Sequence, residues 1–367
     1  MNRLLLLALV LTLAGCTAAR IQQPERLPSF EGFAKTGDGW TLSMFRVPPQ
    51  ETGAAHQGQP VVLVHGTGTN RFTFMLEGSD LATYLSQEGF DVWVAELRGT
   101  RTSSPPDSAT WAQGAWNVDS MASQDVPAIL DHIKAATGRE GVYWVGHSLG
   151  GLLGYAAVQT PLKSRIRGVI TLGAPVAFTH GTDAVARMST FPGIKAKRGR
   201  FPMRALSQLS KGGLGIAPDG QLVHLLMNAD NLDVDAAAAF ATQGTEDIST
   251  GLLQQYGGWF EGGRMKSADG SRDWLEGMAT VDTPLLVLAG TVDQIAPAWS
   301  VRPAYDRAGS SDKTFMKLGR GWGQREEYGH ADLLVGDWAF EEVFPTLRDW
   351  LAGRAGGAGG GVPSEAP

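Results

Sequence analysis

Val142-Tyr143-Trp144-Val145-Gly146-His147-Ser148-Leu149-Gly150-Gly151 is the stretch of sequence that decides the fold. Its first four residues form a short apolar run typical of a buried strand, and Leu149 to Thr160 reads as a helix. Ser148 lies at the junction, where the chain must turn sharply. A β-carbon at position 146 or 150 would clash with the neighbouring backbone, which explains the flanking glycines. This strand, turn and helix context predicts a nucleophilic serine whose hydroxyl projects from the turn.

The chain around this stretch alternates short apolar runs with segments of helical period, a pattern typical of a mostly parallel sheet with helices on both faces. We expect eight strands: Phe33 to Thr36, Thr41 to Arg46, Pro60 to Val64, Val92 to Ala95, Val142 to Val145, Val169 to Leu172, Leu285 to Ala289 and Thr314 to Leu318. The first two should form a hairpin across Gly37-Asp38-Gly39. Helical stripes start at Val126 and Val343.

The alternation breaks between two strands, where about a hundred residues replace a crossover of a dozen or more. We therefore predict an α/β core at 30–176 and 280–352, interrupted by a cap or lid insertion at 177–279. The insertion contains short apolar helical pieces, Leu222 to Met227 and Leu252 to Phe260. It should cover the carboxyl ends of the strands, where open α/β sheets bind ligands.

The N-terminus is expected to be a targeting segment. Residues 1–15 have a positive start followed by an apolar run that is too short to span a membrane, as in a secretory signal peptide. Leu13-Ala14-Gly15-Cys16 resembles a bacterial lipobox, and Cys16 is the only cysteine of the chain. We expect lipidation at Cys16 and a place in the bacterial cell envelope on a membrane surface. The alternative is an ordinary cleaved signal with a chance cysteine.

Both ends of the mature chain should lack packed structure. Residues 16–29 are polar and contain proline, which suits a tether between membrane and domain. Residues 353–367 are mostly Gly, Ala, Pro and Ser, with too little apolar surface to offset the entropy of ordering, so we expect disorder.

The composition argues against nucleic acid, metal ions and organic cofactors as partners. The 367 residues are 43% hydrophobic and 19% charged, which suits a globular fold with a substantial core. A net charge of −6 without a basic stripe argues against nucleic acid as a partner. No Cys/His/Asp cluster has metal-ligand spacing and no glycine loop for phosphate opens the sheet, so the sequence implies neither metal nor organic cofactor.

A serine nucleophile needs a base, and seven histidines are available. Position favours His330, which follows the last predicted strand in Tyr328-Gly329-His330-Ala331-Asp332. The supporting acid should lie between Ser148 and His330. Asp293 is preferred because it directly follows a strand at its carboxyl end.

Two other aspartates are alternative candidates for the acid. Asp282 precedes the same strand and should lie at the wrong edge of the sheet, whereas Asp247 is the second choice for the acid.

The oxyanion of a tetrahedral intermediate needs N–H donors, and Thr67 follows the strand that ends at Val64. The second donor should be the N–H of Leu149, at the start of a helix.

The order His-Gly, Gly-x-Ser-x-Gly, Asp, His resembles the α/β-hydrolase superfamily from Phe33 to Leu351. Thr36 to Leu42 and Trp116 to Ala122 are similar to segments of its acid-lipase branch, the gastric and lysosomal lipases. The resemblance implies a lipase or carboxylesterase that acts on an ester or lipid through an acyl-enzyme, with the insertion as its lid. Leu149 replaces a polar residue of that branch, Thr67-Gly68 replaces apolar residues, and the acid-lipase disulfide is absent.

Three other functions are compatible with this sequence. A peptidase or amidase, or a lipid acyltransferase, would use the same three residues, because fold and triad do not determine the substrate. A surface lipoprotein that keeps the fold only for binding is the third. It would have no need of a base and an acid together with the serine.

Overall fold

The computed structural model describes residues 25, 27–50, 58–178, 199–205, 207 and 226–355. The predicted signal segment, Cys16 and most of the tether lie outside these residues, as do 356–367 and much of the insertion, including Leu222 to Leu225. None of the helices in the described ranges is long and apolar enough to cross a membrane.

The core is one eight-stranded sheet, as predicted, with the strand order β1-β2-β4-β3-β5-β6-β9-β10. Its strands are β1 (Phe30–Lys35), β2 (Thr41–Val47), β3 (Pro60–Val64), β4 (Asp91–Ala95), β5 (Val142–His147), β6 (Ile166–Leu172), β9 (Leu285–Gly290) and β10 (Lys313–Leu318). β2 pairs antiparallel with β1 and β4, and the other strands are parallel. The carboxyl ends of the parallel strands therefore meet at one edge of the sheet.

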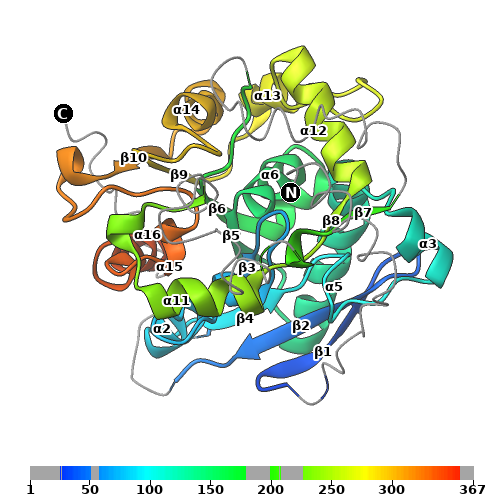
Figure 1. Ribbon diagram of the computed structural model, residues 1–367, viewed down its shortest axis with the longest axis horizontal. Helices are drawn as coiled ribbons and strands as arrows, with labels where there is room; N and C mark the ends of the chain where they lie inside the picture. The colour runs from blue at the N-terminus through cyan, green and yellow to red at the C-terminus, as the bar shows by residue number, and fades with distance from the viewer. Residues whose placement is uncertain are drawn as a thin grey trace, which may run out of the picture.

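Helices cover both faces of this sheet (Figure 1). β3 shows why, because Val62 and Val64 pack into one core cluster while Val61 and Leu63 pack into the other. The first cluster is covered by α5 (Val126–Thr137), α6 (Leu149–Val158) and α14 (Ala298–Arg307). The second is covered by α2 (Leu81–Gln87), α15 (Asp332–Val335) and α16 (Phe344–Ala355).

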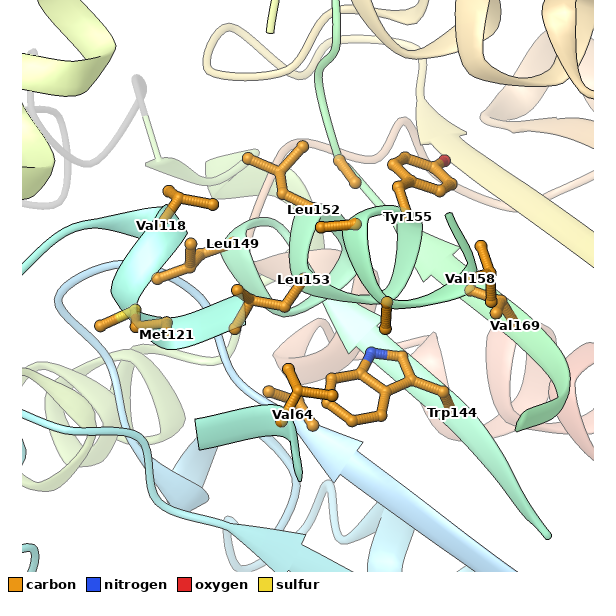
Figure 2. Packing of buried hydrophobic residues seen from close by; sticks show 14 of the residues in the cluster. Val64, Val118, Met121, Trp144, Leu149, Leu152, Leu153, Tyr155, Val158 and Val169 are labelled. Atoms are coloured by element: carbon orange, nitrogen blue, oxygen red, sulfur yellow. The ribbon is translucent and has the colours of Figure 1, made fainter. Parts of the chain in front are cut away.

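Helix α6 is the element on which the centre of the core packs (Figure 2). All ten of its residues are buried, and Leu153 lies on the side of the helix that faces Val64 of β3 and Trp144 of β5, whereas Leu152 lies on the opposite side. Burying one such leucine contributes about 1.5–3 kcal/mol. The indole of Trp144 lies beneath the helix and donates a hydrogen bond of 2.8 Å to the carbonyl of Gly150. α6 is thus fixed both by apolar burial and by a polar contact at its first turn.

Shorter helical elements connect the main strands and helices of the core. They are η2 (Arg71–Thr73), α3 (Ser108–Gln113), α4 (Val118–Ser120), η3 (Met121–Asp125), η4 (Pro161–Arg165), η8 (Arg320–Trp322) and η9 (Ala339–Val343).

The described part of the insertion is mainly helical, with one small sheet. It comprises β7 (Arg200–Phe201), η5 (Ala229–Asn231), α11 (Val234–Ala239), η6 (Phe240–Gly244), β8 (Ile248–Ser249), α12 (Thr250–Gly262), α13 (Trp274–Gly277) and η7 (Met278–Thr280). α12 confirms the helix predicted at Leu252 to Phe260. The β7–β8 pair was not predicted, because two residues per strand are too few to show a period.

Helix α16 runs three residues into the segment that was predicted to be disordered. Gly353, Arg354 and Ala355 belong to the helix. The Arg354 guanidinium pairs with Asp312 and lies 4.0 Å from the centre of the Trp350 ring. The boundary at 353 is therefore wrong, because a long-range ion pair and a cation–π contact offset the low apolar content of this turn.

The close approach at Gly150 gives a testable prediction. Its β-carbon would overlap the Val64 carbonyl oxygen, a backbone atom that cannot rotate away. We expect Gly150→Ala to lower the free energy of unfolding by about 3 kcal/mol or more, measured by thermal or urea unfolding. Gly258→Ala is the control, because a β-carbon there would meet no described atom within 4 Å apart from α12's own neighbouring backbone. It should be neutral or stabilise by up to about 1 kcal/mol, and equal losses in both variants would contradict the prediction.

Candidate active site

Ser148 lies in a strained turn between β5 and α6. Its φ of 51° and ψ of −116° lie in a region that residues with a side chain rarely adopt. The backbone N–H of Ser148 donates to the Leu172 carbonyl at 2.8 Å, which holds the turn against β6. A β-carbon at Gly146 would overlap the backbone of Gly150, so the steric reason given for both glycines is confirmed. Strain of this kind is typical of residues that the surrounding fold presents for chemistry.

His330 and Asp293 form a buried pair. His330 Nδ1 donates to Asp293 Oδ2 at 2.8 Å, and the two residues are 6% and 3% exposed. The other oxygen of Asp293 accepts from the backbone N–H groups of Ile295 and Ala296, at 2.8 and 2.7 Å. With both oxygens occupied, the carboxylate is held in one orientation. Because Nδ1 carries the proton, the lone pair of His330 lies on Nε2.

The two alternative aspartates, Asp247 and Asp282, lie in different surroundings. Asp247 makes an ion pair with Arg200 at 3.4 Å and accepts from the Arg204 backbone at 3.2 Å, both within the insertion. The Asp282 side chain is 72% exposed and pairs with Lys163. The structure therefore brings Asp293, and neither alternative, to His330.

Ser148 and His330 line two cavities that meet at this point. One cavity, of about 120 Å³, is walled mainly by apolar side chains. The other, of about 80 Å³, extends toward the loop after β3. Thr67 lines both. Among the residues that the structure describes, no group of three His, Cys, Asp or Glu side chains is arranged to hold a metal ion.

The loop after β3 packs directly against the serine turn. A β-carbon on Gly66 would lie 3.1 Å from that of Ser148, a tight contact that glycine avoids. The Gly66 carbonyl accepts from His65 Nδ1 at 2.8 Å, and His65 Nε2 accepts from the Leu97 N–H at 3.1 Å. His65 thus joins the ends of β3 and β4. Burial lowers the pKa of His65, so the ring is neutral at pH 7.

The N–H groups of Thr67 and Leu149 are the two that were predicted to receive an oxyanion. Leu149 is the first residue of α6, so its N–H has no acceptor within the helix. The positive end of the helix dipole also favours an anion there. Thr67 lies in the loop that packs on Ser148.

Two residues at the site were not recognised in the sequence. Asp332 is fully buried and accepts from the backbone N–H groups of Gly329 and Asn228, at 2.8 and 3.1 Å. It holds the loop that carries His330, and burial raises the pKa of Asp332 to about 6. His147 donates through Nε2 to the His330 carbonyl at 3.0 Å. The only available signal for Asp332 was its position two residues after a candidate base.

The insertion also reaches the loop after β3. Thr245 forms an antiparallel bridge with Thr69, and the N–H of Glu246 donates to the Gly68 carbonyl at 2.7 Å. The buried Glu246 carboxylate accepts from Asn70 and Arg101, both at 2.8 Å. Burial raises the pKa of Glu246 to about 7, and Arg101 opposes that rise.

This sheet order, with a strained serine after β5 and a buried Asp–His pair after β9 and β10, defines an α/β hydrolase. The chain belongs to the alpha/beta hydrolase fold family, whose model matches residues 59–321. Solved structures agree on the fold. A thermophilic esterase from Thermogutta terrifontis superposes with a TM-score of 0.57 at 17% identity, covering 87% of this chain and 97% of its own. A monoacylglycerol lipase from Paleococcus ferrophilus superposes with a TM-score of 0.55 at 21% identity, covering 85% of this chain and 99% of its own.

The relatives found by sequence are lipases. Triacylglycerol lipase 2 of Arabidopsis thaliana is 37% identical over 164 residues, which are 41% of this chain and 38% of that protein. Human lysosomal acid lipase/cholesteryl ester hydrolase is 34% identical over 174 residues, 45% and 44% of the two chains. Mouse gastric triacylglycerol lipase is 35% identical over 170 residues, which are 43% of this chain and 42% of that protein. The match thus spans less than half the length of these relatives, and it supports the predicted resemblance to the acid-lipase branch.

Glu246 gives a prediction for pH dependence. The folded protein holds this proton more tightly than the unfolded chain, whose carboxyl titrates near 4.5. The contribution of Glu246 to the free energy of unfolding should therefore fall as pH rises from about 4.5 to about 7. Asp125 and Asp332 have pKa values raised to about 6 and act in the same direction. The difference between wild type and Glu246→Gln isolates Glu246.

We expect the unfolding free energy of Glu246→Gln to fall less between pH 5 and pH 8 than that of the wild type. Urea unfolding at intervals of half a pH unit measures both curves. Parallel curves would show that Glu246 is ionised throughout this range and would contradict the raised pKa.

Proposed function

We propose that this protein is a serine ester hydrolase, with Ser148 as nucleophile, His330 as general base and Asp293 as the acid that orients it. The observation that carries the proposal is the meeting, in one cavity, of a strained serine with a buried His–Asp pair whose free nitrogen is Nε2. The lipase relatives support the same reaction class.

In the proposed reaction, His330 Nε2 takes the proton of Ser148 while the serine oxygen attacks the ester carbonyl. The N–H groups of Thr67 and Leu149 receive the negative charge that develops on the carbonyl oxygen. The intermediate then collapses to an acyl-enzyme, and His330 returns its proton to the departing alcohol. Water, activated by the same histidine, releases the acid and restores the serine. Asp293 keeps Nδ1 protonated throughout.

The larger cavity supports an apolar acyl group. Leu253, Tyr256 and Phe260 lie three and seven residues apart on one face of α12 and line this cavity. Leu152, Trp259 and Ile295 complete much of its wall. Among the described residues that line it there is no Asp, Glu, Lys or Arg. Such a lining favours a neutral ester with an aliphatic chain over an aminoacyl substrate, which would bring a charged amine.

The test is turnover by the full-length chain in detergent. We expect a fluorophosphonate to label the wild type, and p-nitrophenyl esters to be hydrolysed with a preference for aliphatic acyl chains. Ser148→Ala should neither label nor turn over ester above about 10⁻⁴ of the wild-type kcat. If the wild type fails to label and hydrolyses none of these esters, the proposal is wrong, and preferred cleavage of aminoacyl amides would assign it to the peptidases.

Paired aspartate variants test the acid in the same assay. Asp293→Asn should lower kcat by about 10⁴-fold, because the amide favours the wrong tautomer of His330. Asp247→Asn should leave kcat within a few-fold of wild type, since its carboxylate binds Arg200 and the Arg204 backbone. A loss confined to Asp247→Asn would refute the assignment.

We further propose that Cys16 carries a lipid anchor and that the enzyme acts at a membrane of the bacterial cell envelope. The support is the sequence alone, in which a charged start, an apolar run and Leu13-Ala14-Gly15-Cys16 occur in that order. Metabolic labelling with a fatty acid should be lost in Cys16→Ser. Label that persists in this variant would refute the anchor.

A further inference from the structure

A hydroxyl pair links the insertion to the loop that carries the proposed oxyanion donor. Thr67 Oγ1 and Tyr256 Oη lie 2.6 Å apart, and the two residues are separated by 189 positions in the sequence. Tyr256 comes from α12, on the face that lines the apolar cavity. In the described part of the chain, each hydroxyl has the other as its only hydrogen-bond partner.

This pair of hydroxyls has two protons, and the hydrogen bond between them uses only one. A phenol is a stronger acid than an aliphatic alcohol and is therefore the better donor, so Tyr256 donates and Thr67 accepts. Burial raises the pKa of Tyr256 above its ordinary value, so the phenol keeps its proton at neutral pH. The proton of the Thr67 hydroxyl is then free to point elsewhere.

The position of Thr67 shows where that proton can go. Thr67 lines both cavities, and each of them also contains Ser148 and His330. Gly66, the preceding residue, packs against the β-carbon of Ser148. Thr67 therefore borders the space in which a carbonyl bound at Ser148 would develop its charge.

We propose that the Thr67 hydroxyl is a third donor to the oxyanion, in addition to the two backbone N–H groups, and that Tyr256 positions it. This inference rests on the proposed function. Thr67 is a catalytic residue through its side chain as well as its backbone. Tyr256 is a positioning residue, because it fixes the Thr67 rotamer and, by donating to Oγ1, makes the Thr67 O–H a stronger donor.

Four variants test the proposal with p-nitrophenyl esters and a trifluoromethyl ketone, which forms a tetrahedral adduct with a serine nucleophile. Thr67→Val keeps the β-branched shape and removes the hydroxyl, so kcat should fall about 10²-fold with little change in KM. Thr67→Ser keeps the hydroxyl and should recover most of this loss. Tyr256→Phe should lower kcat about 10-fold in the wild type and have no effect in Thr67→Val. Ketone affinity should fall in parallel with kcat.

The outcomes separate this inference from the proposed function. If the wild type shows no turnover and no labelling, the hydrolase proposal fails first. If the wild type is active and Thr67→Val matches it in kcat and ketone affinity, the third donor is refuted. If Tyr256→Phe costs the same in both backgrounds, or changes KM alone, Tyr256 only shapes the apolar cavity. A melting temperature for each variant shows that the protein remains folded.

Discussion

The contact between Gly150 and the end of β3 is the constraint on which the rest of the site depends. Because neither Gly150 nor Gly146 has a β-carbon, the first turn of α6 can press against the strands. Ser148 is then forced into a positive φ, at a cost of about 1–3 kcal/mol. The complete burial of α6 offsets this cost many times over. The result is a serine that cannot turn away and a helix N-terminus beside it.

With the serine fixed, the other groups must be brought to it from later strands. Asp293 follows β9, and two backbone N–H groups hold its carboxylate. His330 follows β10 on a loop whose own geometry is set by Asp332, a buried carboxyl that accepts from two further N–H groups. Backbone N–H groups thus hold the Asp293 carboxylate, which orients the His330 ring, and the Asp332 carboxyl, which holds the loop of His330. The relative orientation of Ser148, Asp293 and His330 therefore depends on how the strands that precede them pack in the sheet.

The fold and the proposed triad could be predicted from the sequence because their signals are local. Short apolar strands such as β3 and β9, and the glycines around Ser148, need only their immediate neighbours to be recognised. Asp293 was preferred over Asp247 for the same reason, since it directly follows a strand. Asp332 was missed because a buried carboxyl is indistinguishable in sequence from an exposed one. Tyr256 was missed because its partner lies 189 residues away, across the boundary between insertion and core.

The same argument explains Thr67, which differs from the apolar residue that the resemblance to acid lipases would place there. A half-buried hydroxyl beside an apolar cavity is costly unless it has a partner, and no neighbour in the loop after β3 provides one. Tyr256 supplies that partner from the insertion. A threonine at 67 and a tyrosine at 256 are therefore best understood as one feature. Because the insertion also donates to the Gly68 carbonyl through the Glu246 N–H, it holds the loop after β3 at two points. Besides lining the apolar cavity, the insertion therefore also contacts the loop that is proposed to stabilise the transition state.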